Sequence, residues 1–512
     1  MVSTPASTAY VEAVACIFGN ANYTLNPLPQ EQRWVRFTQL LAALGDPQLG
    51  LCVVHVAGTN GKGTTSAICD KMLRGADARV GLFTSPHLHS WRERIRIDGA
   101  LVSKHEVEAA WALLRPHVEV DVPFTPFEKL TALALVCFRR AKVDVAVLET
   151  GLGGRFDCTN HVPEPAVAGL CRVGIDHVAV LGHSVREIAW HKAGIVKRGV
   201  PAFSVSQTAD ARAVIETTAS ELGAPLCFVS PQHPLVARAL ALAGADAADA
   251  AALPTWLRPS HQLENFALAA AMVHSLAERG LLRPPAAAAA VPAGDSHERT
   301  SELMDAALRA ALRTNWPGRT ELISAPAGAG ASPTPPHVAR LIFDVAHNED
   351  AVRALLANLP RIVPPTGGSG GGSTGARASI ELIFGANKDK DMRVMLAMIG
   401  ELTGARGDGA TSPCVLAINL VSSSHPKACP LAELAAVARE AAPDAPWRTE
   451  HATMAEALAA AASGTRAELH CTIVFGSVFV VADARAQLAV LRPDMFKESD
   501  WAFEQAGEPP IV

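Results

Sequence analysis

Apolar segments rich in β-branched residues alternate along this chain with segments whose apolar positions recur at helical spacing. Such alternation is typical of α/β proteins in which helices connect the strands of mainly parallel sheets. Strands are predicted at residues 51–56, 79–83, 143–148, 166–173 and 201–205. Helices are predicted at residues 65–74, 105–114 and 127–140. The Asp98-Gly99 pair after the alternating segment 94–97 predicts a β-hairpin.

The pattern is interrupted in the middle of the chain and then resumes. Alanine dominates residues 234–254 and 285–312. Residues 324–336 and 364–375 are of low complexity, and their Gly, Ser and Pro content is typical of flexible surface insertions. Further strands are predicted at residues 340–345, 380–384, 414–421 and 471–475. We therefore expect two α/β domains, at residues 1–313 and 314–512.

Length, composition and charge narrow the class of protein. A chain of 512 residues, 49% of them hydrophobic, is long enough for two or more domains with large cores. Its net charge of −5 argues against a dedicated nucleic-acid binder, which normally carries a basic excess. No apolar run reaches the ~18 residues of a membrane span, and the ten cysteines, without a C-x-x-C pair, read as buried free thiols. We expect a cytoplasmic monomer without nucleic-acid or membrane partners, with a mitochondrial form as the alternative location.

The strongest local signal is the run VVHVAGTNGKGTT, in which a buried strand leads into a glycine-rich turn that opens a helix. The backbone N–H groups of such a turn can cradle phosphates. Lys62 would neutralise phosphate charge, and Thr64 or Thr65 could offer a hydroxyl to Mg²⁺. The spacing departs from the general G-x-x-x-x-G-K-[ST], because only two residues separate Gly58 from Gly61. We predict a phosphate site here; the alternative is a plain strand–turn–helix with the lysine in solvent.

Two further polar side chains follow predicted strands. Glu149 ends the strand in VDVAVLETGLGG, and ligands of open α/β sheets bind beyond the carboxyl ends of strands. A carboxylate there could bind Mg²⁺, although an acid at a strand end is also common as a surface charge. His177 follows the strand that ends at Val173. Imidazole is an unusual magnesium ligand and a lone histidine is more often structural, so the residues alone leave His177 undecided.

In its motifs the chain resembles the folylpolyglutamate synthase/dihydrofolate synthase family, the folate branch of the Mur ligase superfamily. Besides the two segments above, the matching motifs are, in family order, TSPHLHSWRERIRIDG, TPFEKLTALAL, GIDHVAVLGHSVREIAWHKAGIVK, HQLEN, WPGRTE, DVAHN and FGANKDKD. The resemblance implies an N-terminal P-loop ATPase domain and a smaller C-terminal Rossmann-like domain, with the active site in the cleft. It also implies that ATP and Mg²⁺ are used to phosphorylate a folate carboxylate, which the amino group of L-glutamate then attacks.

The resemblance further implies roles for individual residues. The catalytic residues would be Lys62, Lys192 and His347. The lysine that Lys192 matches is carbamylated in related enzymes, where the carbamate helps to hold a second metal ion. ATP would contact Gly58, Asn60, Gly61, Lys62, Gly63, Thr64, Thr65, Asn265, Arg319 and Asp344. The metal would be bound by Ser85, Glu149, His177 and Thr64, and the folate by Ser85, Pro86, His87 and Arg92.

Two positions depart from the family pattern. The usual D-G-A-H-N is DVAHN here, so that Val345 would stiffen the turn, and His191 stands where a glutamate commonly precedes the carbamylated lysine. Some of the weaker motifs also have plain structural alternatives. Residues 316–319 could be a linker turn, His347 a helix cap, and residues 388–391 an exposed helix start.

We expect a folylpolyglutamate synthase that extends reduced folates by glutamate. The nearest alternative is a dihydrofolate synthase, which joins dihydropteroate to L-glutamate, or one enzyme with both activities. A remote alternative is a P-loop ATPase that forms no covalent product.

Overall fold

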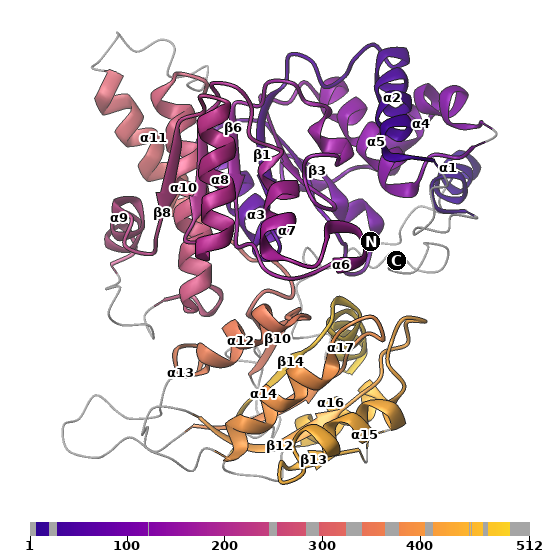
Figure 1. The fold of residues 1–512 in the computed structure, drawn as a ribbon, viewed down its shortest axis with the longest axis vertical. Coiled ribbons are helices and arrows are strands. Elements are labelled where there is room, and N and C mark those ends of the chain that lie inside the picture. Colours follow the sequence, from indigo (N-terminus) through magenta and orange to yellow (C-terminus); the bar gives the residue numbers. More distant parts are fainter. Residues whose placement is uncertain are drawn as a thin grey trace, which may run out of the picture.

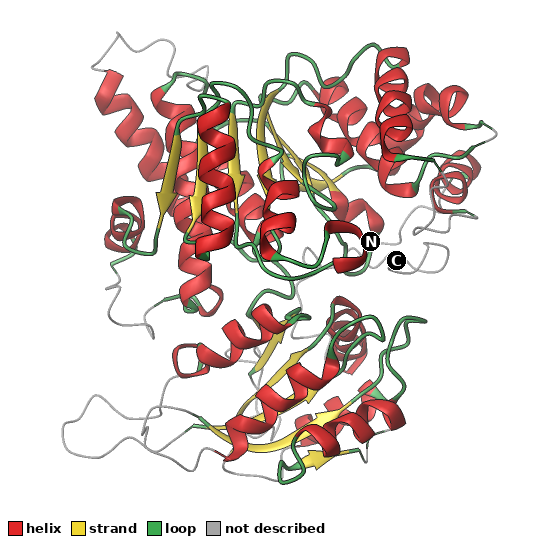
Figure 2. Cartoon of the chain, viewed as in Figure 1, coloured by secondary structure: helices red, strands yellow, loops and turns green. Residues whose placement is uncertain are grey.

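The computed structural model describes residues 7–19, 28–120, 122–244, 253–282, 296–323, 340–363, 378–404, 413–449, 451, 453–463 and 469–491. The insertions expected at 324–336 and 364–375 lie outside these ranges. Two α/β units, each built around its own sheet, lie one above the other (Figure 1). Helices flank the strands in both units (Figure 2), which confirms the expected fold class.

The first unit contains an eight-stranded sheet in the order β4-β3-β2-β5-β1-β6-β7-β8. Its strands are β1 (Cys52–Ala57), β2 (Val80–Phe83), β3 (Ile95–Ile97), β4 (Ala100–Leu101), β5 (Val145–Glu149), β6 (Val167–Leu170), β7 (Ala202–Val205) and β8 (Leu226–Val229). The strands from β2 to β8 in this order pair in parallel, whereas β3 and β4 form an antiparallel hairpin. Its turn is the expected Asp98-Gly99 pair, with φ of 53° and 80°. The predicted strands of this unit are confirmed, and β8 is an additional one.

The central strands are apolar throughout because both faces of the sheet are covered. On β1, Val54 and Val56 contact one hydrophobic cluster and Val53 contacts another. The first cluster involves α3 (Lys62–Gly75), α9 (Pro234–Leu242), α10 (Ser260–Glu278) and α11 (Ser296–Ala311). The second involves α1 (Thr8–Phe18), α2 (Gln30–Ala43), α4 (Lys104–Val118) and α5 (Pro126–Ala141). The short α6 (Val178–Leu181), α7 (Val185–Ala193) and α8 (Ala209–Glu221) follow β6 and β7.

The second unit contains a six-stranded sheet in the order β13-β12-β11-β14-β10-β9. Its strands are β9 (Glu321–Ile323), β10 (Leu341–Asp344), β11 (Ser379–Phe384), β12 (Cys414–Leu420), β13 (Trp447–Arg448) and β14 (Leu469–Phe475). Only β9 pairs antiparallel with its neighbour in this described sheet. Its helices are α12 (Glu349–Ala357), α13 (Leu359–Ile362), α14 (Met392–Gly404), α15 (Leu431–Ala441), α16 (Met454–Ser463) and α17 (Val478–Leu491). The expected division after Arg313 falls between α11 and β9.

The exposure of the cysteines and the length of the apolar helices concern two further expectations. All ten cysteines are free thiols, but only five of them are buried: Cys16, Cys52 and Cys158 are partly buried, and Cys227 and Cys414 are exposed. Cys227 lies on the edge strand β8, and Cys414 is the first residue of β12, so neither position is covered on all sides. Within the described part of the chain, no helix is long and apolar enough to cross a bilayer.

Candidate active site

A cavity of about 950 Å³ is lined by residues of both units. The first unit contributes the loops after β1, β2, β5 and β6, and the second contributes the turn before β9, the loops after β10 and β11, and the start of α17. Because parallel strands end at the same sheet edge, loops far apart in sequence meet there. Of the predicted site residues, the lining includes Asn60, Gly61, Lys62, Gly63, Thr64, Ser85, Pro86, Glu149, His177, Lys192, Asn265, Arg319, Asp344 and His347.

Four predicted site residues do not line this cavity. Gly58 is the first residue of the glycine-rich loop and Thr65 lies in the first turn of α3, where its hydroxyl accepts a hydrogen bond from the Cys171 thiol. His87 is buried and accepts a hydrogen bond of 2.8 Å from Arg94. Arg92 donates to the Val102 carbonyl oxygen at 2.8 Å. The structure therefore does not place His87 or Arg92 against a substrate in the cavity; Arg94, which the sequence did not single out, lines it instead.

The glycine-rich loop joins β1 to the N-terminus of α3. Its last residue, Gly61, has φ of 92°, and a Cβ atom there would lie 2.4 Å from Asn265 Oδ1. Only glycine fits this left-handed, crowded position without strain. A helix N-terminus leaves its first N–H groups without intrahelical partners, which makes it a site for anions. The loop is thus built to approach a ligand closely at the edge of the sheet.

Two lysines converge on one carbonyl oxygen of this loop. Lys62 Nζ donates to Gly58 O at 3.0 Å, and Lys192 Nζ, from α7, donates to the same oxygen at 2.7 Å. Burial, and then the charge of Lys62, lower the pKa of Lys192 to about 7. The positive charge beside the loop would be stabilised by a phosphate anion.

The predicted metal-binding residues lie around the same loop. Glu149, at the end of β5, is 3% exposed, and its Oε2 accepts a hydrogen bond of 3.0 Å from Ser85 N. Burial raises the pKa of Glu149, although Lys62 and Ser85 oppose this. Burial disfavours the charged form of His177 as well, and for an imidazole this lowers the pKa, here to about 4 despite the opposing charge of Asp176.

These donors fit a magnesium ion held jointly with phosphate oxygens. No group of three or more His, Cys, Asp or Glu side chains within the described ranges is arranged to hold a metal. Mg²⁺ commonly binds through one or two carboxylates together with substrate phosphates and waters. One buried carboxylate, with the Thr64 hydroxyl close to the glycine-rich loop, matches that arrangement better than a site made by the protein alone.

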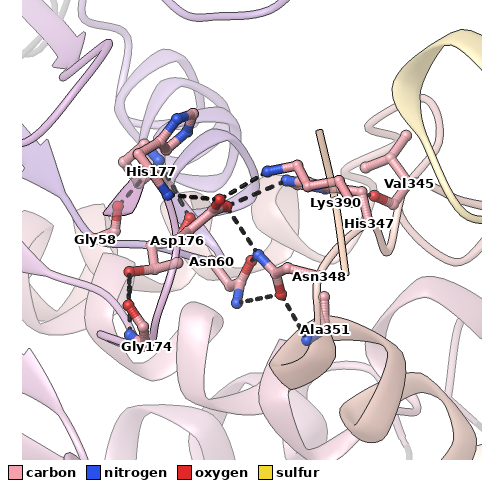
Figure 3. Close-up of polar contacts among 12 residues, drawn as sticks. Gly58, Asn60, Gly174, Asp176, His177, Val345, His347, Asn348, Ala351 and Lys390 are labelled. Atoms are coloured by element: carbon pink, nitrogen blue, oxygen red, sulfur yellow. Dashed lines mark hydrogen bonds and ion pairs between the residues drawn. The ribbon is translucent and has the colours of Figure 1, made fainter. Parts of the chain in front are cut away.

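Three side chains of the second unit lie around the carboxylate of Asp176 (Figure 3). Lys390 Nζ donates to its Oδ1 at 2.7 Å, and Asn348 Nδ2 donates to its Oδ2 at 3.1 Å. His347 Nε2 lies 3.7 Å from Oδ2. Burial alone would raise the pKa of Asp176, but His347, His177 and Lys390 outweigh it and hold this pKa well below its usual range.

Asn348 also reaches the glycine-rich loop. Its side-chain amide and that of Asn60 donate to each other, at 3.2 and 3.3 Å (Figure 3). Asp176, Asn348 and Lys390 were not assigned a role from the sequence, although all three lie in the quoted motifs. The alternative of an exposed helix start is wrong for Lys390, because its side chain is only 13% exposed and α14 begins after it.

The turn before β9 places Arg319 in the cavity. Asp344 supports this turn, since its Oδ2 accepts hydrogen bonds from the backbone and hydroxyl of Thr320 at 2.9 and 3.0 Å. Burial lowers the pKa of Arg319, while Asp344 and Glu149 oppose this. Val345 packs beside Gly318, where an added Cβ atom would lie 2.9 Å from its Cγ1. The departure at Val345 is thus accommodated by the neighbouring glycine.

An aromatic region also lines the cavity. Trp34 stacks on His161 with ring centroids 3.7 Å apart, Phe37 meets the same imidazole edge-on, and Phe127 lies against Gly151. Asp157 lines the cavity too, and burial raises its pKa although Thr159 and backbone N–H groups donate to it. Aromatic side chains with a buried polar group are suited to a flat heteroaromatic ligand. This region could not be found from local sequence patterns, because its members come from three separate segments.

Comparisons with known proteins agree with the motifs. The chain is 32% identical over 412 residues to dihydrofolate synthase/folylpolyglutamate synthase of Bacillus subtilis, which covers 78% of this chain and 84% of that protein. It is 37% identical over 288 residues to the mitochondrial folylpolyglutamate synthase of Homo sapiens, covering 53% of this chain but 46% of that protein. No protein-family model matches the chain.

Solved structures share the fold. The bifunctional folylpolyglutamate synthase/dihydrofolate synthase of Yersinia pestis, complexed with AMPPNP and Mn ion, aligns with a TM-score of 0.67 and 26% identity. That alignment covers 96% of this chain and 100% of the other. Folylpolyglutamate synthase of Mycobacterium tuberculosis, complexed with ADP and AMPPCP, aligns with a TM-score of 0.65 at 24% identity and supports the fold alone. With the motifs, the fold and the identity to the Bacillus protein in agreement, the chain belongs to the folylpolyglutamate synthase/dihydrofolate synthase family and is an ATP-dependent ligase.

Proposed function

We propose that this ligase acts as a folylpolyglutamate synthase, which joins L-glutamate to the glutamyl carboxylate of a reduced folate. The observation that carries the proposal is one cavity lined both by groups suited to phosphate and by aromatic side chains. The glycine-rich loop, Lys62 and Glu149 form what we call the phosphate end, and the aromatic region lines the same cavity. A nucleotide at the phosphate end and a pterin against the aromatic region would direct the folate carboxylate toward the terminal phosphate.

Phosphorylation of the carboxylate requires two anions to approach each other. A carboxylate is a poor acyl donor because oxide would have to leave, and transfer of the phosphoryl group replaces oxide by phosphate. Lys62, Arg319 and Lys390 supply positive charge from both units around the cavity. Preorganised cations of this kind stabilise charge on the phosphoryl oxygens in the transition state.

A magnesium ion bound by Glu149 and Thr64 would supply further charge neutralisation at the phosphates. Ser85 and His177 are the other proposed ligands, and His177 is neutral at pH 7 because burial keeps its pKa at about 4. The complex of the Yersinia relative with AMPPNP and Mn ion supports a nucleotide and a divalent metal in this family. Lys192 would be carbamylated only as the neutral amine, and its pKa of about 7 supports that role.

The second step needs a site without water. The amino group of L-glutamate attacks the acyl phosphate, the C–N bond forms as phosphate leaves, and the nitrogen loses a proton. Water would hydrolyse the same intermediate, so exclusion of water protects the product. The contacts of Asp176 and Asn60 with the second unit hold the two units together beside the glycine-rich loop, which would help to exclude water there. His347 lines the cavity, and we propose that it acts in this step.

The alternative is a dihydrofolate synthase, or an enzyme with both activities. The two reactions differ only in whether the carboxylate belongs to a pteroate or to a folate, and the phosphate end serves both. The Bacillus and Yersinia relatives carry both names, which favours a bifunctional enzyme as the second candidate.

The test is ADP release by purified protein with ATP, Mg²⁺ and L-glutamate, with tetrahydrofolate or dihydropteroate offered separately. Release with tetrahydrofolate alone is the expected result. Release with both acceptors would establish the bifunctional enzyme, and release that needs neither acceptor would establish a non-ligating ATPase. We further propose that the protein is cytoplasmic. We also propose that it is a monomer, because residues of one chain line the cavity from both units, and sedimentation of the purified protein tests this.

A further inference from the structure

The loop after β2 inserts its tip into the second unit. Leu88 is 7% exposed and belongs to a hydrophobic cluster with Val345 and Val481 of the second unit. Glu93 fixes this tip, because its carboxylate accepts hydrogen bonds from the backbone N–H groups of Leu88, His89 and Ser90 at 2.8–3.0 Å. The loop is therefore a preformed projection of the first unit that docks on the second.

Arg485 of α17 connects this tip to the turn that carries Arg319. It is 1% exposed, its Nε donates to His89 Nε2 at 3.3 Å, and it forms an ion pair with Glu321. Glu321 in turn accepts a hydrogen bond of 2.9 Å from Gly318 N, immediately before Arg319. Burial and the charge of Arg485 lower the pKa of His89 to about 3, so the imidazole stays neutral and accepts this hydrogen bond at pH 7.

The other end of the same loop touches the metal-binding region. Ser85 N donates to Glu149 Oε2, and Ser85 and Pro86 line the cavity. A substrate that orders this loop would therefore affect Glu149 at one end and Arg485 at the other. Arg485 does not line the cavity, so any effect that it has on the reaction passes through its neighbours.

We propose that Arg485 is a positioning residue that couples the loop 85–93 to Arg319, so that docking of the loop tip holds Arg319 in its place beside the phosphate end. The proposal rests on the proposed function, since it concerns the residues that stabilise phosphoryl transfer. A guanidinium is suited to this task because its planar donors can bind two partners in fixed directions.

The test compares His89→Phe and Arg485→Met with the wild-type enzyme in ADP release with tetrahydrofolate. Loss of a hydrogen bond to a charged group predicts a fall in kcat of about tenfold or more. The KM for ATP should change much less, because the glycine-rich loop is untouched. His89→Phe keeps the test valid if Arg485→Met unfolds, and thermal unfolding of each variant reports this. The matched control is Arg361→Gln, which removes a hydrogen bond to Arg258 O between the units without touching the loop.

The decisive experiment is a double variant with Arg319→Ala. If Arg485 acts through Arg319, adding His89→Phe or Arg485→Met to Arg319→Ala lowers kcat little further. Multiplicative losses, or a kcat of His89→Phe equal to that of wild type, overturn the coupling while leaving the ligase intact. Absence of folate-dependent ADP release by the wild type would instead overturn the proposed function itself.

Discussion

Substitution of Lys390 by methionine tests whether the contacts at Asp176 hold the two units together for catalysis. The pair is largely buried, with side-chain exposures of 13% and 9%. Removing one partner of a fully buried pair costs roughly 3–5 kcal/mol. Asp176 retains hydrogen bonds from Asn348 and from the backbone of His177, so we expect a smaller cost of about 1.5–3 kcal/mol, the range for one hydrogen bond to a charged group.

That cost falls on the closed arrangement of the units, because Lys390 and Asp176 belong to different units. A loss of 1.5–3 kcal/mol corresponds to about tenfold to hundredfold less of the closed enzyme. We therefore expect kcat/KM for ATP in the folate-dependent ADP assay to fall by this factor. Lys390→Arg, which keeps the charge, should restore part of the loss.

The matched control is Arg393→Met, three residues further along the chain. Arg393 pairs with Glu440 at 2.8 Å, but both side chains are more than half exposed, so its loss should cost about 0–1 kcal/mol. The reasoning is refuted if Lys390→Met keeps the wild-type kcat/KM, or if Arg393→Met loses as much. Thermal unfolding of both variants separates a local effect from general destabilisation.

Four further predictions concern the phosphate end of the cavity. Lys62→Ala should abolish ADP release in the ligation assay, and wild-type turnover would contradict the phosphate assignment. Glu149→Gln should raise the Mg²⁺ concentration for half-maximal activity by about tenfold or more, since a charge-assisted ligand is lost; an unchanged Mg²⁺ titration would count against it. Gly61→Ala should weaken ATP binding in calorimetry, because φ of 92° and a Cβ atom 2.4 Å from Asn265 Oδ1 impose strain of about 1–3 kcal/mol; wild-type affinity would show that the loop yields. Because the pKa of Lys192 is about 7 when folded and 10.5 ordinarily, the unfolded state binds more protons between these values, and the free energy of unfolding should rise with pH there relative to Lys192→Met. A constant difference in urea unfolding at pH 7 and pH 9.5 would disprove that shift.

The sequence predicts those parts of the fold and site that depend on neighbouring residues. Strand β1 and the turn that follows it are local patterns, so the glycine-rich loop and Lys62 are found without knowledge of the fold. Glu149 is found because a strand end has a known position in a parallel sheet. The three-residue strand β9 is too short to show periodicity, and it is recognised only once its pairing with β10 is known.

Contacts between distant segments could not be predicted in this way. Asp176 and Lys390 are 214 positions apart, and Lys390 lies in a charged segment that is typical of a solvated surface. The contact between His89 and Arg485 could not be predicted either, since these residues are 396 positions apart. His87 and Arg92 were expected to contact the substrate because they belong to the motif that forms the substrate loop. The side chains of this segment that line the cavity are those of Ser85, Pro86 and Arg94.

Strands β10 and β11 of the second sheet have their carboxyl ends at the cavity and their amino ends away from it. Arg340 immediately precedes β10 and Ala378 immediately precedes β11, so both residues lie at the amino ends of these strands. Asp344 and the loops that line the cavity lie at the opposite, carboxyl ends of these strands. Arg340, which is exposed, therefore offers an attachment point for a fluorophore at a distance from the reacting groups. A donor placed there, paired with an acceptor on the first unit, could follow the approach of the two sheets during turnover while the ligase remains chemically intact.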